Sequence, residues 1–423
     1  MASSKPLLID GSTGEGGGQL VRLACALAAV TSRPIEIINI RANRGGDRGG
    51  GLKSQHVSAI EWLAKATKAE VKGLAVGSRT LEFRPRVPPT SPKERKIVIK
   101  AESHGASTLL ILQAVFPYLL FSGSENGDPI ELEIHGSTNP SFSPSYEYLD
   151  QVLLPTLQER FGIVVERRLE KRAWTTGPLS PGTIWLKFRP IPPGHTLKLV
   201  KPWNEQRQVG DLETMRRIDV SILVPYAMLE PMEQAMIDCL GGEFPEAEIN
   251  FVLREESGHD ARMYALAVAH SESGLRWGRD FLYDRKWKGK QKTTIAKEIA
   301  KTVTKRLWEQ TVIHTAAVDE YLQDQLVVFQ ALAEGRTTYW SRATEKLDAE
   351  AQLGREKDID ETDRGPENLP LDKNMKRDKT HEPFGFGSTH ATTARWVASE
   401  LMPTIQWFNN GTICEGAGIS LQL

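Results

Sequence analysis

The sequence predicts an α/β (α+β) protein in which a large domain carries a smaller inserted domain. Through residue 165, short runs of β-branched residues alternate with helical patterns, which is typical of stacked α/β units. A proline-rich stretch at 190–200 then precedes a second set of strand and helix patterns. At 423 residues, the chain is long enough to build two hydrophobic cores of ordinary size.

The first part of the large domain, residues 1–189, is predicted to begin with alternating strands and helices. The runs IEIINI (35–40) and KIVIK (96–100) are rich in β-branched residues, and IELEI (130–134) alternates as a half-buried strand does. Apolar residues at helical spacing occupy the remaining segments, at 19–30, 55–65, 107–120 and 146–161.

Residues 190–285 are predicted to form the smaller inserted α/β domain. After the connector PIPPGHTLKLV, strand patterns occur at 218–224 and 262–270, with a helix around 231–240 between them. The large-domain pattern then resumes with helices at 294–312 and 321–333. We therefore assign residues 286–423 to the second part of the large domain.

The segment 342–379 differs in composition from the rest of the chain. Of its 38 residues, 20 are charged, nine basic and eleven acidic, and none is aromatic. Such a composition buries too little apolar surface to pack a core, so we predict a disordered loop. A tolerated insertion is the simplest interpretation, and a lid or a partner site is the alternative.

Bulk properties exclude several classes of protein. The net charge is −1, so any nucleic-acid contact must come from a local basic patch. The three cysteines form no C-x-x-C pair, which favours a reducing compartment. The longest apolar run, 109–121, is too short to span a bilayer. These features predict a cytoplasmic or nuclear protein and leave the oligomeric state open.

The segment DGSTGEGGGQ (10–19) runs from a strand pattern into a helix. Glycines there allow backbone N–H groups to approach a ligand closely, and a helix N-terminus attracts anions. Glu15 is a candidate ligand for a cation that bridges phosphates, and Gln19 and Arg22 share one helix face. The segment matches neither a P-loop nor a dinucleotide fingerprint, and a plain glycine turn remains the alternative.

Arg41 and Arg44 directly follow the strand at 35–40, and Gln55 comes after a short glycine-rich loop. In α/β proteins ligands gather at the carboxyl ends of strands, and guanidinium groups match phosphate oxygens. These residues are therefore candidates for a phosphate site. The alternative is a pair of surface arginines.

His390 is the candidate nucleophile. It lies in Gly387-Ser-Thr-His-Ala-Thr-Thr393, where Ser388 or Thr389 can cap a helix that runs from about residue 391 to 401. The dipole at that helix start disfavours imidazolium, and neutral imidazole is a competent nucleophile toward phosphorus. A structural or solvated histidine is the alternative.

Two further groups of residues are candidates for contacts with a nucleotide. Tyr321, Asp324 and Gln325 lie at i, i+3 and i+4 of a predicted helix and converge on one face. Gln113 lies in an otherwise apolar helix and needs a hydrogen-bond partner if buried. The alternatives are a polar patch at a helix start and a bond to the backbone.

Taken together, these segments resemble the RNA 3′-terminal phosphate cyclase family, in its catalytic branch. The resemblance runs in order along nearly the whole chain and rests on IDGSTGEGGGQLVRLACAL, IRANR, GLKSQH, HGSTN with Pro144-x-x-x-Tyr148, VDEYLQDQLVVFQALAEG and the H-x-x-T of 390–393. It implies a large domain of repeated β-α-β-α-β-β units and a small inserted domain.

The resemblance also implies an activity with three steps. His390 would take AMP from ATP, AMP would pass to an RNA 3′-phosphate, and the adjacent 2′-hydroxyl would displace it to form a 2′,3′-cyclic phosphate. Glu15 would bind Mg²⁺ or Mn²⁺, and Arg22 and Arg44 would hold phosphates. The other positions that match nucleotide or phosphate contacts are Gln19, Arg41, Gln55, Gln113, Pro144, Tyr321, Leu322, Gln323, Asp324 and Gln325.

Two other classes of protein share parts of this pattern. Non-catalytic cyclase-like proteins that act in ribosomal RNA processing and ribosome assembly lack the histidine nucleophile, whereas His390 and Glu15 are present here. Enolpyruvyl transferases share a similar repeated unit, but their chemistry does not use a histidine nucleophile at this place.

The loop 45–51 departs from the cyclase family, because it lacks the usual Pro-Gly.

Overall fold

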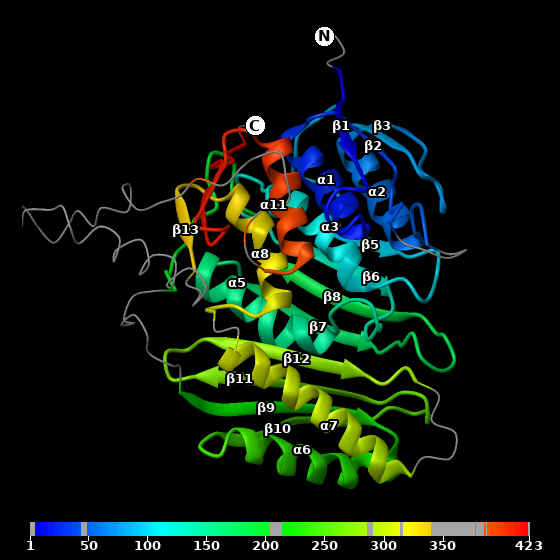
Figure 1. Cartoon of the computed structure of the whole chain (residues 1–423). Coiled ribbons are helices and arrows are strands. Elements are labelled where there is room, and N and C mark those ends of the chain that lie inside the picture. Colours follow the sequence, from blue (N-terminus) through cyan, green and yellow to red (C-terminus); the bar gives the residue numbers. More distant parts are fainter. Residues whose placement is uncertain are drawn as a thin grey trace, which may run out of the picture.

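The computed structural model describes most of the chain as stacked layers of sheets and helices (Figure 1). The described residues are 5–43, 49–203, 214–285, 291–313, 316–339, 377, 385 and 387–421. Two of the sequence predictions fall outside them: the phosphate contact of Arg44, and the disordered loop at 342–379, of which only Arg377 is described. Both stay predictions.

The first sheet confirms the early strand and helix patterns. Its elements, in chain order, are β1 (Leu7–Asp10), α1 (Gly18–Thr31), β2 (Ile35–Ile38), α2 (Ser54–Thr67), β3 (Glu70–Lys72) and β4 (Leu81–Arg84). The strand order is β1-β2-β4-β3, in which β1 and β2 run parallel and β4 is antiparallel to both neighbours.

The second sheet has the same order of strands and connecting helices. Its elements are β5 (Lys96–Lys100), α3 (Thr108–Leu120), β6 (Ile130–Gly136), α4 (Tyr146–Tyr148), the π-helical turn η1 (Leu149–Leu153), α5 (Leu154–Phe161), β7 (Val165–Lys171) and β8 (Gly182–Phe188). Its strand order, β5-β6-β8-β7, parallels that of the first sheet. The two sheets thus share one strand order.

The third group of elements closes the upper part of the molecule. It comprises α8 (Glu320–Leu332), β13 (Arg336–Thr338), α11 (Thr389–Leu401), β14 (Gln406–Phe408) and β15 (Ile413–Glu415), with strand order β13-β15-β14. A parallel bridge joins Lys198 to Glu334, beside β13. Residue 198 therefore pairs with the third group, although it follows the predicted domain boundary at 190.

A fourth sheet lies at the bottom of Figure 1 and corresponds to the predicted insertion. Its elements are β9 (Met215–Val224), the turn η2 (Tyr226–Met228), α6 (Leu229–Glu243), β10 (Glu248–Glu256), β11 (Tyr264–Ser271), β12 (Arg276–Leu282), α7 (Lys292–Trp308) and η3 (Glu309–Ile313). The strand order is β10-β9-β11-β12. α7 packs on α6, β11 and β12, although it lies beyond the predicted boundary at residue 285.

Helices that belong to the first sheet, the second sheet and the third group of elements pack together. α1 contacts α2, α3 and α11, and α8 contacts α3 and α11. α1 is buried from Gln19 to Val30, and α3 is apolar almost throughout, as helices enclosed on several sides must be. In the described part of the chain, no helix is both long enough and apolar enough to cross a bilayer.

Candidate active site

The start of α1 and the start of α11 meet in the helical layer. The hydrogen bond that joins them connects Glu15 and Thr393, which are 378 positions apart in the sequence. The backbone N–H of Glu15 donates to Thr393 Oγ1 over 3.0 Å, and this hydroxyl in turn donates to the carbonyl of Thr389 over 2.6 Å. Ser388 caps α11 by accepting from the Ala391 N–H over 3.1 Å, as its position before the helix predicts. Glu15 and the first turn of α11 are thereby tied together.

His390 lies in this first turn of α11 and faces Glu15. Its Nδ1 is 3.0 Å from Glu15 Oε2, while the Glu15 side chain is 9% exposed and that of His390 42% exposed. A carboxylate at Nδ1 favours the tautomer that carries its proton there. The lone pair is then on Nε2. The geometry thus provides an oriented imidazole, part of which is open to solvent.

The glycines before α1 allow an approach that larger residues would block. Gly14 and Gly16 have φ of 63° and 60°, values that favour glycine. A Cβ on Gly18 would lie only 2.6 Å from His56 Nε2 and 2.9 Å from an Arg22 terminal nitrogen. Gly17, the N-cap of α1, makes no side-chain cap hydrogen bond, and a helix N-terminus of this kind attracts anions.

Predicted phosphate contacts gather beside this helix start. Gln19, Arg22 and Gln55 are buried, and Arg41 is partly buried with φ of 56°. Burial lowers the pKa of Arg22 to about 10, Asp324 acts to raise it, and the nearby Arg41 lowers it further. Two guanidinium groups in such a poorly hydrated place are typical of an anion site.

His56 belongs to the same group of residues, although the sequence did not single it out as a site residue. It is 1% exposed, and its Nδ1 accepts from the Lys53 N–H over 3.0 Å, so Nε2 carries the proton. Burial, with Arg22, Arg41 and Lys53, holds its pKa well below the usual value. His56 Nε2 has no hydrogen-bond partner among the described residues. The only signal in the sequence for a role of His56 was that it directly follows Gln55, a predicted phosphate contact.

A pocket of about 580 Å³, a volume that includes open solvent, lies among α3, α4, η1, α5 and α8. Gln113, Pro144 and Gln325 line it with a largely apolar set: Leu109, Leu110, Leu112, Phe116, Pro117, Tyr148, Leu149, Leu153, Leu154, Leu157, Val328 and Phe329. Arg22 Nε donates to Gln113 Oε1 over 2.7 Å. This bond joins Arg22 to the pocket. It also gives Gln113 the hydrogen-bond partner that a polar side chain in a buried helix requires.

The five residues of the segment 321–325 do not all face this pocket. Gln325 lines it, while the ring of Tyr321 lies edge-on to that of Tyr148, with centroids 5.8 Å apart. Leu322 is 1% exposed in the core. Gln323 donates to Tyr339 Oη over 2.7 Å and packs so closely on Gly387 that a Cβ there would overlap its amide. Gln323 therefore supports the turn that leads to His390.

Asp324 directly precedes Gln325 of the pocket and interacts electrostatically with His390. Burial raises its pKa to about 7, although His390, a hydrogen bond from Gln325 and Arg22 act to lower it. That hydrogen bond, from Gln325 Nε2 to Asp324 Oδ1, is 2.7 Å long. A carboxyl with such a pKa changes charge near neutral pH, within reach of both an imidazole and a guanidinium.

We predict that Asp324→Asn stabilises the protein at pH 8 but not at pH 4. Between about pH 4 and pH 7 the folded protein keeps a proton on Asp324 that the unfolded chain releases, so stability falls as the pH rises from about 4 to about 7 and then levels off. The expected gain at pH 8 is on the order of 2 kcal/mol, because partial exposure weakens the full effect. Thermal unfolding at both pH values measures it.

The control for this prediction is Asp238→Asn, an exposed position on α6. It should change stability little at either pH. Equal effects of Asp324→Asn at pH 4 and pH 8 would contradict the assigned titration.

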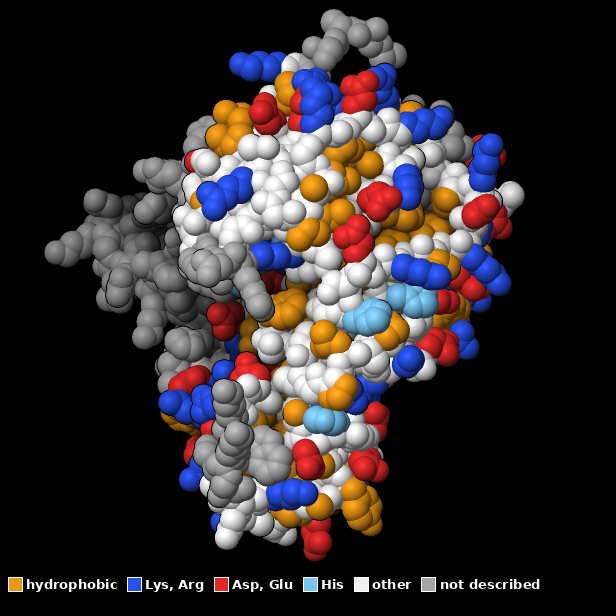
Figure 2. All heavy atoms as spheres, turned by 90° about the vertical axis from the view of Figure 1, so that its right-hand side faces the viewer, with side chains coloured by type: hydrophobic (Ala, Val, Ile, Leu, Met, Phe, Trp, Pro, Cys, Tyr) orange, Lys and Arg blue, Asp and Glu red, His pale blue; other side chains and the backbone are white. Residues whose placement is uncertain are grey.

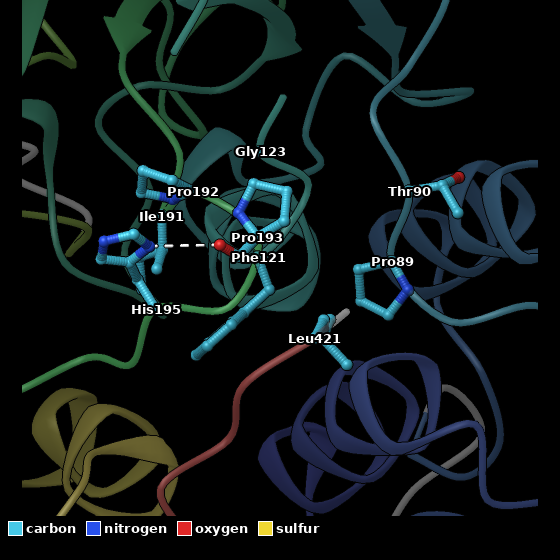
Figure 3. A pocket seen from close by; sticks show the side chains of 9 residues that line it. All are labelled: Pro89, Thr90, Phe121, Gly123, Ile191, Pro192, Pro193, His195 and Leu421. Atoms are coloured by element: carbon cyan, nitrogen blue, oxygen red, sulfur yellow. Dashed lines mark hydrogen bonds between the residues drawn. The ribbon is translucent and has the colours of Figure 1, made fainter. Parts of the chain in front are cut away.

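A separate hollow of about 300 Å³, also counted with open solvent, contains none of the predicted site residues (Figure 3). Prolines and other apolar residues form most of its lining, and its one titratable side chain is His195, whose Nδ1 lies 3.1 Å from the carbonyl of Pro193. Nothing in this lining resembles a group of catalytic residues. The candidate active site is therefore the region around His390.

The chain matches one protein family over most of its length. A family model described as RNA 3′-terminal phosphate cyclase matches residues 13–353. Curated proteins named RNA 3′-terminal phosphate cyclase from Thermococcus sibiricus and Thermococcus onnurineus are 31% and 33% identical to the chain. Each alignment covers 78% of this chain, and 86% and 87% of the respective relative. A relative of the same name from Methanopyrus kandleri is 32% identical over 335 residues.

Two details of these comparisons concern the predicted nucleophile and the predicted location. The family match ends at residue 353, so it includes Glu15 and the segment 321–325 but not His390. The relatives come from archaea, which have no nucleus, so they lend no support to a nuclear location. The match covers most of the chain, and it includes the glycines before α1 and the residues that line the pocket. The chain therefore belongs to the RNA 3′-terminal phosphate cyclase family.

Proposed function

We propose that this protein converts an RNA 3′-phosphate to a 2′,3′-cyclic phosphate with ATP, through an AMP–histidine intermediate. The observation that carries the proposal is the arrangement at the start of α11. There His390 Nδ1 lies 3.0 Å from a nearly buried carboxylate, so Nε2 bears the lone pair. Activation by ATP is required because a phosphate monoester is a poor electrophile, whereas a mixed anhydride carries a good leaving group.

In the first step, His390 Nε2 attacks the α-phosphorus of ATP. An N–P bond forms, the bond to the bridging oxygen breaks, and pyrophosphate leaves. Glu15 stabilises the positive charge that develops on the imidazole and holds the ring in place. Arg22, Arg41 and the Nε2–H of His56 are placed to hold phosphate oxygens around the start of α1.

The pocket beside this site suits the nucleoside of ATP. Its largely apolar lining, with Pro144 and the ring of Tyr148, favours a planar base, and Gln113 and Gln325 offer polar groups that can orient it. Asp324 directly precedes Gln325 and interacts electrostatically with His390, so it could accept a hydrogen bond from a ribose hydroxyl. The arrangement would place the α-phosphate near His390.

The residues also fit Mg²⁺ or Mn²⁺ held mainly by phosphate. Within the described ranges, no group of three or more His, Cys, Asp or Glu side chains is gathered to hold a metal ion. Glu15 is a single carboxylate next to a predicted phosphate site, which is how Mg²⁺ is commonly bound together with a nucleotide. A metal ion bound there would neutralise charge on the phosphates.

In the second step, an oxygen of the RNA 3′-phosphate attacks the same phosphorus, the N–P bond breaks, and His390 is released. In the third, the adjacent 2′-hydroxyl attacks the 3′-phosphorus, AMP leaves, and the ring closes. On the face in Figure 2, the described basic and acidic side chains are interspersed. We therefore infer that RNA is held mainly at its terminal sugar and phosphate, with little reading of base sequence.

An RNA with a labelled 3′-terminal phosphate tests this function directly. With ATP and Mg²⁺, the label should become resistant to phosphatase and should become sensitive again after mild acid opens the ring. Omitting ATP should prevent the change. Label that stays fully phosphatase-sensitive with folded protein would contradict the proposal and favour a non-catalytic cyclase-like protein in ribosome assembly.

A further inference from the structure

The inserted sheet contacts the proposed nucleotide pocket through its edge strand β12. Gly278 of β12 packs directly on the pocket wall: a Cβ there would lie 2.8 Å from Val152 Cγ2 and 2.9 Å from the Tyr148 ring. The next residue, Arg279, is 5% exposed and places its guanidinium 4.5 Å from the centroid of the Tyr321 ring. Two successive residues of one strand therefore contact both tyrosines of an edge-on pair.

Asp319 joins this strand to the pocket. It is fully buried, and its two carboxylate oxygens have separate partners. Oδ1 accepts from Tyr148 Oη over 2.7 Å and from the Leu322 N–H over 2.9 Å, which caps α8. Oδ2 accepts from the Gly278 N–H over 2.9 Å. One side chain thus connects α8, the pocket tyrosine and β12.

We propose that β12 of the inserted sheet sets the position of Tyr148 at the nucleotide pocket, with Asp319 as the positioning residue that links Gly278 to Tyr148. The inference rests on the proposed function, because it assumes that the pocket binds the nucleoside of ATP. Asp319 touches neither nucleotide nor reacting atoms in this scheme. It acts through Tyr148, and the inserted sheet thereby contributes to nucleotide affinity without supplying a catalytic group.

The separate partners of the two oxygens allow a selective substitution. In Asp319→Asn, the amide oxygen can replace Oδ1 and keep both the helix cap and the bond from Tyr148, since Asn is a good capping residue. The amide nitrogen then faces the Gly278 N–H, so two donors oppose each other. The substitution therefore breaks the link to β12 and leaves the other two bonds possible.

The experiment measures transfer of label from α-labelled ATP to the protein as a function of ATP concentration. Asp319→Asn should raise the ATP concentration for half-maximal rate about tenfold, since a buried hydrogen bond is replaced by opposed donors. The rate at saturating ATP should stay within about twofold, because His390 and Glu15 are untouched. Tyr148→Phe, which keeps the ring and loses only the hydroxyl, should act in the same direction.

The matched control is Ser221→Ala, which removes another hydrogen bond between the inserted sheet and the large part, from Gln151 Nε2 to Ser221 Oγ over 2.8 Å. Its ATP dependence should equal that of the wild type. In the Tyr148→Phe background, Asp319→Asn should have a smaller effect than alone, because the two residues act through one bond.

Four outcomes would each overturn the inference. An Asp319→Asn protein with wild-type ATP dependence, or fully additive losses in the double variant, would overturn it while leaving the proposed function intact. If Asp319→Asn does not fold, Tyr148→Phe decides alone, and an unchanged ATP dependence would overturn the inference. Absence of label on the folded wild type would overturn the proposed function, and this inference with it.

Discussion

Replacing His390 with Asn is expected to abolish labelling of the protein by α-labelled ATP, with little change in thermal stability. Asn lacks a nitrogen nucleophile, so no N–P bond can form. The side chain is 42% exposed, and the cap of α11 depends on Ser388, so the fold should tolerate the change. Label separated on a denaturing gel measures the covalent step without RNA, and thus isolates the first step of the proposed reaction.

His195→Asn is the matched control, because His195 is an exposed histidine in the hollow that contains no predicted site residue. It should be labelled as the wild type is. Should the His390→Asn protein retain acid-labile, alkali-stable label, another residue would be the nucleophile. The assignment of His390 would then be wrong even if cyclisation itself were observed.

Glu15→Ala is expected to slow labelling on the order of 10³-fold, because the carboxylate orients His390 and balances its developing charge. The Mg²⁺ concentration needed for half-maximal rate should also rise, since the same carboxylate is the proposed metal ligand. Single-turnover labelling at a series of Mg²⁺ concentrations measures both effects. Excess Mg²⁺ should restore only part of the rate, because it cannot orient the imidazole.

The exposed Glu36 of β2, the strand that pairs with β1, provides a control, and Glu36→Ala should leave labelling unchanged. A Glu15→Ala protein with normal rate and unchanged Mg²⁺ dependence would refute both roles. If excess Mg²⁺ fully restored the labelling rate of Glu15→Ala, the role of Glu15 as a metal ligand would stand. Its role in orienting His390 would then be refuted. The two roles are therefore separable in one experiment.

Local signals were sufficient for the elements that carry the site. Glycines before an apolar helical pattern place the start of α1 at Gly18, next to the predicted Gln19, and Ser388 caps α11 as expected. Helix starts can be predicted in this way because capping and backbone freedom involve residues within a few positions of each other. The polar face of Tyr321, Asp324 and Gln325 follows from helical spacing for the same reason.

Contacts between distant segments could not be predicted from local sequence signals. The bond from Arg22 to Gln113 joins residues 91 positions apart, and nothing near either residue specifies the other as its partner. His56 differs from a surface histidine only through burial between Gly18 and the cationic side chains. Likewise, the packing of α7 on β11 and β12 depends on which apolar faces meet across the fold.

The sequence by itself determined the α/β class, the strands and helices with clear local patterns, the glycines before α1 and the candidate nucleophile, because these depend on local spacing and composition. Only the tertiary structure decided that Glu15 lies beside His390, that Leu322 and Gln323 do not line the pocket, and that Asp319 links Tyr148 to β12. Such contacts arise when helices and sheets bury their apolar faces together, and that packing selects among many arrangements with the same local pattern.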